Sequence, residues 1–590
     1  MGTGGFDFKE FWLLRRSDPG ITVAAAASLF VIALGYLDLI PVLGIPKLVI
    51  QTTVLIEYLH EGFPKLIIFS YSGLLCANFL IASYRFSRER HDPHLIQTRF
   101  FSSFDLFFAV FAPLQILMFA YHIFTLDRAE FAARKDAFRP GAFDATARLF
   151  ANPTEVSLFR SAFHYLQLRD VPSLSVKWVL NLISQYKWRM TIHELRAKSR
   201  SETSPSSKQP TRHTDRKRPN RSIIAAFSFS GMAVLVYSIV AIVTSDHACA
   251  PHPHCIIPSY RWNVGSQSCS CLVFVDRKTV ITSFDEWLEP DDTTANLEAL
   301  AAPCYLKIVQ IINRQLPTLP SALRNCRHLE QLILIYTKTQ EIPEWTKDFS
   351  EMEYFHIEGD SSPKQLAALP PDLFDTMTNL LFLHLGSLLN IQVVLNVAKL
   401  VHLEYLVLAM LHSVTEIPAL DTLTRLRRLS ITDCILVKQL PRLEQLKHLR
   451  YFGLTARSPT CCNGYLNGTC DLSAFSCRKR VAEPEVTCTD KRMSDEDRAL
   501  IASVAGIVCD YRRVDLKDGL PTRASSDGAC GGVMYKQCIH MGLAGMCYPA
   551  RMQVVSCQLD PMYIAMRRLE IQRHVGQPCD PKIESWLDCT

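Results

Sequence analysis

Cysteine is almost absent from the first part of the chain. Of the 20 cysteines in 590 residues, only Cys76 precedes residue 245. The net charge of +6 is also uneven, because it arises from a basic segment at 127–221. A uniform cytosolic enzyme is rarely divided in this way, and an apolar content of 48% excludes disorder throughout. The length and this division predict several units in two compartments.

Catalytic signatures are missing as well. The sequence contains neither G-x-S-x-G nor H-E-x-x-H, and segment 127–221 lacks the phosphate loop and catalytic loop of kinases. No paired C-x-x-C motifs suggest zinc. We therefore expect no enzymatic activity, no cofactor, no metal and no nucleic-acid partner.

Long apolar runs, in contrast, are frequent in the first half. Runs at 21–40, 64–83, 103–126 and 222–244 are long enough to span a bilayer, which takes roughly 20 predominantly apolar residues. They predict an N-terminal membrane region at 1–126, a basic cytosolic loop at 127–221 and a transmembrane helix at 222–244. The basic flank of the last run places the C-terminal half outside the plasma membrane. Three to five crossings remain open, because 42–59 could add a span and 103–126 could enter and return.

The end of the basic loop, 196–221, is rich in Ser, Pro, Lys and Arg and is expected to be disordered. Such a cluster attracts anionic lipid by about 1 kcal/mol per basic residue near the surface. Its alternative role is a plain topology signal.

The hexamer L-x-x-L-x-L recurs seven times in register. Its first positions are Leu306, Leu329, Met352, Leu380, Leu403, Leu426 and Leu449, spaced by 23 residues except for one interval of 28. This pattern resembles the leucine-rich-repeat family, which implies a solenoid of short strands over 306–457. A Cys-containing flank at 245–305 precedes the repeats.

Two columns of the predicted strands could form a recognition surface. The first contains Tyr354, Phe382, Tyr405, Arg428 and Tyr451, and the second contains His356 and His384. Aromatic residues and arginine dominate binding hot spots. Adjacent strands lie about 4.8 Å apart, so the two histidine rings could meet and titrate near neutral pH. Cross-strand packing is the alternative, and two histidines without a third ligand make a weak metal site.

The repeats also divide the cysteines. Cys326 and Cys434 occupy core positions and should be buried free thiols. Five cysteines precede the repeats, and an odd number leaves one thiol that could link two chains as a homodimer. Twelve follow the repeats and indicate an extracellular disulfide scaffold of unknown pairing: Cys461, Cys462, Cys470, Cys477, Cys488, Cys509, Cys530, Cys538, Cys547, Cys557, Cys579 and Cys589.

Two local motifs lie in the same region. Asn467-Gly468-Thr469 is an N-glycosylation acceptor sequence. Ser494 and Asp497 form a capping box that predicts a helix ending near Cys509.

The run from Cys461 to Asp471, with the later cysteines, resembles the oomycete WLGC-domain membrane proteins. The terminal Trp586-Leu587-Asp588-Cys589 corresponds to the family name, with Asp in place of Gly. The resemblance implies a WLGC-like module at 458–590 behind membrane spans and extracellular repeats.

The expected fold is therefore a multi-pass α-helical membrane region, an extracellular α/β leucine-rich-repeat solenoid and a disulfide-rich C-terminal module. The expected function is non-enzymatic recognition or adhesion towards an extracellular protein or cell-wall ligand. The alternative is a subunit of a transporter or channel with a regulatory ectodomain.

Overall fold

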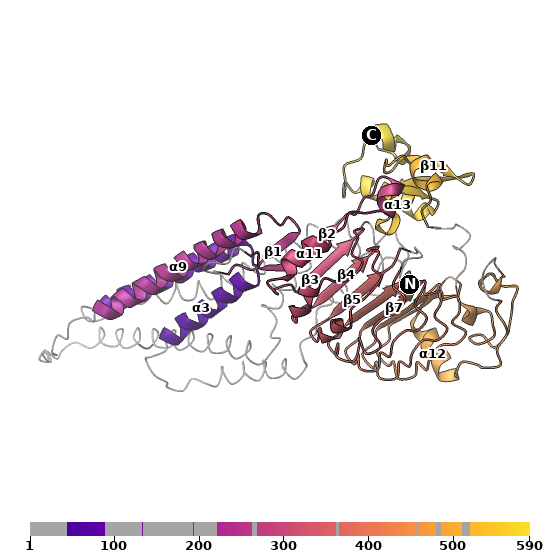
Figure 1. Cartoon of the computed structure of the whole chain (residues 1–590), viewed down its shortest axis with the longest axis horizontal. Helices are drawn as coiled ribbons and strands as arrows, with labels where there is room; N and C mark the ends of the chain where they lie inside the picture. The colour runs from indigo at the N-terminus through magenta and orange to yellow at the C-terminus, as the bar shows by residue number, and fades with distance from the viewer. Residues whose placement is uncertain are drawn as a thin grey trace, which may run out of the picture.

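The computed structural model describes only part of the chain. The described residues are 44–88, 221–261, 268–360, 365–455, 457–479, 485–509 and 520–589, with the single residues Ala133 and His193. Within them a helical region leads into a curved sheet, and the C-terminal module lies above that sheet in Figure 1.

Three helices form the described part of the helical region. They are α3 (Gly44–His60), α4 (Lys65–Arg88) and α9 (Arg221–Cys249). Buried side chains such as Leu59, Ile68 and Leu75 form their shared core. A 2.8 Å hydrogen bond between the Ser83 and Ser228 hydroxyls and a 2.6 Å ion pair between Lys65 and Asp246 join α4 to α9. Part of the apolar surface of α4, including Ile68 and Leu75, therefore serves helix packing.

The prediction of a multi-pass helical membrane region is wrong for the chain as the structure describes it. One described helix, Ile224–Cys249, is long and apolar enough to cross a membrane, and the apolar part of α4, Lys65–Ile81, is shorter. Hydropathy measures apolarity but not environment, so a packed helix passes the same test. The runs at 21–40 and 103–126 and most of the basic loop lie outside the described residues. The transporter alternative depended on several crossings and therefore loses its structural basis in the described residues.

A ten-stranded sheet forms the centre of the structure. Strand β1 pairs antiparallel with β2, and β2 to β10 follow in parallel, in chain order. The repeat strands are β3 (Ile308–Ile312), β4 (Gln331–Ile335), β5 (Tyr354–Glu358), β6 (Phe382–Gly386), β7 (Tyr405–Ala409), β8 (Arg428–Thr432) and β9 (Tyr451–Thr455). This arrangement agrees with the solenoid-like stack that the seven hexamers predict.

The two ends of the sheet carry strands outside the leucine pattern. They are β1 (Cys255–Pro258) and β2 (Cys271–Arg277) at one end and β10 (Ala505–Val508) at the other. Helices α10 (Phe284–Leu288) and α11 (Thr294–Ala301) follow β2, and the 3-10 turns η1 (Ser321–Asn325) and η2 (Glu344–Asp348) lie within the first two return arms. The added strands β1, β2 and β10 protect the otherwise open ends of the leucine-patterned stack.

Alternation along each strand separates the core from the concave face. The second strand position is fully buried in every repeat: Val309, Leu332, Phe355, Leu383, Leu406, Leu429 and Phe452. Because side chains alternate in a strand, the first, third and fifth positions point to the opposite, concave side. Cys326 and Cys434 lie in the core as free thiols.

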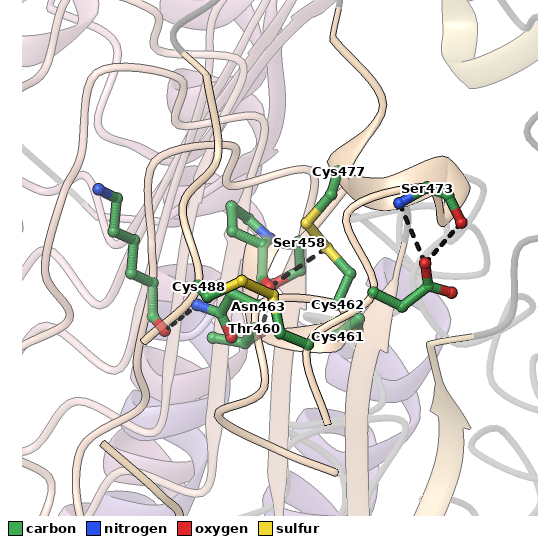
Figure 2. Close-up of a disulfide and its surroundings, with 12 residues drawn as sticks. Ser458, Thr460, Cys461, Cys462, Asn463, Ser473, Cys477 and Cys488 are labelled. Atoms are coloured by element: carbon green, nitrogen blue, oxygen red, sulfur yellow. Dashed lines mark hydrogen bonds between the residues drawn. A yellow bond between two sulfur atoms is a disulfide. The ribbon is translucent and has the colours of Figure 1, made fainter. Parts of the chain in front are cut away.

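A disulfide-linked cap closes the C-terminal end of the repeats. Its bonds are Cys461–Cys509, Cys462–Cys477 and Cys470–Cys488, and its turns are η3 (Pro459–Cys461) and η4 (Phe475–Cys477). Figure 2 shows Asn463 beside this cluster, where its Nδ2 donates a 2.8 Å hydrogen bond to the carbonyl of Lys438. The cap is therefore tied directly to the last return arm.

The capping-box helix is shorter than predicted. Helix α12 covers Asp495–Val504, and the chain then enters β10 beside β9. Gly506 makes this possible, because a Cβ there would lie 1.9 Å from Cε2 of Tyr451. Asp497 also accepts a 2.9 Å hydrogen bond from the Leu443 amide, which fixes the helix against a return arm.

The last module is a small disulfide-rich unit. It contains the turn η5 (Ala524–Gly528), the antiparallel strands β11 (Gln537–His540), β12 (Leu543–Tyr548) and β13 (Ser556–Gln558), and then η6 (Ala550–Met552), α13 (Pro561–Gln572), α14 (Pro581–Glu584) and η7 (Ser585–Leu587). Its disulfides are Cys530–Cys547, Cys538–Cys557 and Cys579–Cys589. All twelve cysteines after the repeats are thus paired.

Candidate recognition surface

The aromatic column predicted from the sequence lies on the concave face. Parallel pairing sets Tyr354 beside Phe382 and Phe382 beside Tyr405. The rings of Tyr354 and Phe382 stack with centroids 4.1 Å apart, and Tyr405 lies 6.3 Å from Phe382. These three side chains are only 8%, 3% and 4% exposed, so they form a buried cluster instead of an open surface.

Part of this cluster is supplied by the C-terminal module. Met552 packs with the three aromatic residues, and Tyr336 and three isoleucines complete the group: Ile312, Ile333 and Ile335. Arg551 points Nη1 at the Met410 sulfur, 3.8 Å away. The turn at 550–552 therefore fills the concave side of the middle strands.

The module is held there by contacts with the N-terminal flank. Ile281 pairs with Val554 in a parallel bridge, and the Val555 amide donates a 2.9 Å hydrogen bond to the Ile281 carbonyl. Arg523 makes a two-pronged contact with the Asp285 carboxylate. Paired donors and acceptors of this kind fix orientation as well as contact.

The concave face is less covered towards its C-terminal end. Val407, Arg428, Ser430 and Tyr451 are half-buried there. The Arg428 guanidinium lies 3.9 Å from the centroid of the Tyr451 ring, within the range of a cation–π interaction. This end presents an arginine and an aromatic ring together on adjacent strands.

The histidine column contains a third polar group that the sequence reading missed. His356 and His384 stack at 4.1 Å, and Glu358 Oε2 lies 3.5 Å from His356 Nε2. The Tyr336 hydroxyl donates a 3.0 Å hydrogen bond to Glu358 Oε1. The signal was available, because Glu358 follows His356 by two positions and so shares its face.

Electrostatics favour the ionised form of Glu358. Burial alone would raise the pKa of its carboxyl, but the neighbouring side chains of His356, His384 and Arg551 lower this pKa to about 2. Burial, with the carboxylate of Glu358 beside it, raises the pKa of Tyr336 well above its ordinary value. The cluster therefore holds a carboxylate beside two stacked imidazoles.

The remaining predicted site residues lie elsewhere. Asn467 is exposed in the C-terminal cap. Before the repeats, Cys249 pairs with Cys269 and Cys255 with Cys271, which leaves Cys304 as a half-buried free thiol. The glycan at Asn467 and the homodimer through Cys304 stay predictions.

Comparison with known proteins identifies one part of the chain. Residues 525–590 match the WLGC domain family, which confirms that part of the resemblance. No curated protein matches the chain. A solved leucine-rich-repeat protein of Leptospira interrogans is 16% identical, with a TM-score of 0.16, and the match covers 27% of this chain and about half (56%) of that one. This TM-score supports no conclusion about function, and neither result shows an oomycete source.

Proposed function

We propose that this protein is a non-enzymatic recognition or adhesion protein. Its ligand is an extracellular protein or wall polymer bound by the less covered end of the concave face. The observation that carries the proposal is the pairing of Arg428 with Tyr451 beside Val407 and Ser430, all half-buried on neighbouring strands. Arginine and tyrosine are among the residues most enriched in binding hot spots.

The proposed surface is narrower than the column predicted from sequence. Tyr354, Phe382 and Tyr405 belong to the cluster around Met552 and support the surface without forming it. A ligand approaching β7 to β9 would meet a rigid strand platform, which reduces the entropy lost on binding.

We propose an oxidising, extracellular location for the repeats and the C-terminal module. Eight disulfides link the described residues on both sides of the repeats. Such density is typical of secreted or surface domains. The exposed apolar residues Phe229, Val236 and Val243 of α9 suit contact with lipid, and α9 would then hold the domain at the plasma membrane.

The binding proposal is tested by comparing variants of the full-length protein. Immobilised protein is incubated with extracts of surface proteins and, separately, of wall polymers. We expect Arg428→Ala and Tyr451→Ala to abolish most of the specific retention. Lys447→Ala is the matched control, because it removes an exposed positive charge just outside β9. Equal retention by all variants would overturn the assignment of this surface.

A further inference from the structure

Three potential metal ligands converge on the concave face. His356 and Glu358 come from β5 and His384 from β6, and their ligand atoms all lie within 4.8 Å of one another. The register explains this, because His356 is paired with His384, and Glu358 with Gly386. The other two groups of this kind in the described residues consist of cysteines that are engaged in disulfides.

Gly386 leaves the space into which these side chains lean. A Cβ at this position would lie 2.9 Å from His384 Nε2 and 3.3 Å from Glu358 Cγ. Glycine opposite Glu358 therefore keeps open a small polar space bounded by an imidazole and a carboxylate.

One atom at this space lacks a normal partner. His356 is 3% exposed, and its Nε2 is buried without a hydrogen bond, since Glu358 Oε2 at 3.5 Å is too distant for one. Buried polar atoms are nearly always satisfied, and an exception needs a cause such as an ion. This orphaned nitrogen belongs to the same three-ligand group.

We propose that His356, His384 and Glu358 bind a divalent transition-metal ion such as Zn²⁺. Two imidazoles and a carboxylate match the nitrogen and oxygen ligands that zinc prefers, at bond lengths of about 2.0–2.2 Å. The small side-chain shifts needed to reach such lengths are open to His384, which is half-buried. Three protein ligands leave a fourth position for water or a group of the bound partner.

The surroundings provide support of the kind seen around metal ligands. The Tyr336 hydroxyl holds the second oxygen of Glu358 at 3.0 Å, and so fixes the carboxylate that would face the ion. The Phe382 ring lies edge-on to both histidines, at 6.0 and 6.2 Å between centroids. An apolar wall on this side excludes water and strengthens ion binding.

One neighbouring charge opposes the ion and gives the proposal a specific signature. The turn at 550–552 packs over β4 to β7 through Met552, and the charge of its Arg551 lowers the pKa of the Glu358 carboxyl. A second cation close to this carboxylate is repelled by the guanidinium. Neutralising Arg551 should therefore strengthen metal binding, whereas loss of any ligand should weaken it.

The test uses the full-length protein without a histidine tag, after its metals have been removed with a chelator. Zn²⁺ is titrated by calorimetry, and Co²⁺ by the visible absorption of a low-coordinate site. We expect one Zn²⁺ per chain that disappears in His384→Gln and Glu358→Gln and tightens in Arg551→Gln. His328→Gln is the matched control, because His328 and Glu351 form a 3.0 Å pair that is exposed and has no third ligand.

The outcomes separate metal binding from folding and from ligand recognition. A loss of Zn²⁺ affinity of at least about 10-fold in His384→Gln, with an unchanged melting temperature of the metal-free protein, supports the site. If His356→Gln fails to fold, the comparison of Zn²⁺ affinity between wild type and His384→Gln remains, because His384 is only half-buried. Zn²⁺ affinity equal in wild type and His384→Gln, or no binding by wild type, would overturn the proposal. Neither result affects retention through Arg428 and Tyr451.

Discussion

Asn313 Nδ2 donates a hydrogen bond to the main-chain carbonyl of Met552, which lies 239 residues further along the chain. The same amide donates to the Lys278 carbonyl at 2.7 Å. Asn313 has a φ of +56°, a left-handed conformation that asparagine tolerates better than most residues. One side chain thus joins the N-terminal flank, the first repeat and the C-terminal module.

We expect Asn313→Gly to lower the free energy of unfolding by about 1–3 kcal/mol, because a buried and a part-buried carbonyl lose their donor. Asn313→Ala should cost about 1–2 kcal/mol more, since alanine is strained at positive φ. Thermal unfolding of both variants measures the two contributions separately. Equal stability of both variants and wild type would show that this link contributes nothing.

Arg567 is the buried centre of the C-terminal module. It is fully buried, contacts Glu584 at 2.7 Å and Glu570 at 3.1 Å, and lies 4.1 Å from the centroid of the Tyr535 ring. Removing one partner of a buried ion pair leaves an uncompensated charge, so Arg567→Met should cost about 3–5 kcal/mol. Denaturant unfolding should show this, whereas the half-exposed Arg568→Met should change little. If Arg567→Met lowers the free energy of unfolding as little as Arg568→Met does, Arg567 is not the stabilising centre of the module.

Asp588 occupies the place that glycine takes in the WLGC name. Its φ of +67° and ψ of +27° are left-handed, and its contact with Arg568 is a weak, exposed pair at 3.9 Å. We expect Asp588→Gly to stabilise the protein by up to about 1 kcal/mol, because glycine adopts this conformation without strain. Asp588→Val should destabilise by about 1–2 kcal/mol. Melting temperatures in the opposite order would contradict this reading.

Asp433 gives the repeats an acid-sensitive contact. Burial alone would raise its pKa, but His412, whose Nε2 lies 3.1 Å from Oδ2, and the charge of Arg457 lower it. A folded-state pKa below the unfolded value of about 3.9 gives stability that is present above that value and lost as pH falls through the folded pKa.

We therefore expect the free energy of unfolding of wild type to exceed that of Asp433→Asn by about 1 kcal/mol at neutral pH. This difference should shrink below about pH 4. Asparagine is the matched replacement, because Asp433 has a φ of +52° that both residues tolerate. Chemical denaturation across this pH range measures the difference. A gap that widens in acid would show that the carboxylate does not stabilise the fold.

The repeat strands could be predicted because each carries its own leucine pattern. Phe355 and Leu383 are buried in register for reasons contained in their own hexamers. Strand β10 could not be predicted in this way, since it depends on Gly506 passing beneath the Tyr451 ring. The apolar run of α4 was misread for a related reason, because its partner α9 is distant in the sequence.

In the candidate site, too, some features follow from local sequence and others depend on residues that are distant in the chain. The aromatic column lies on one face because of the strand register, but its burial depends on Met552, which no local pattern connects to Tyr354. The stacking of His356 on His384 follows from register alone. Strand alternation could also have predicted that Glu358 shares this face. The effect of Arg551 on the pKa of Glu358 could not be predicted, because it depends on the folded C-terminal module.

Covalent side-chain footprinting tests the central claim most directly. The full-length protein is labelled alone and with the extract fraction that it retains, and the modified residues are read by mass spectrometry. Recognition by the concave face predicts that Val407 and Tyr451 become shielded, while Val393 and Val401, exposed on the return arms, keep their labelling. Shielding of Val393 and Val401 with unchanged labelling of Val407 and Tyr451 would contradict the account.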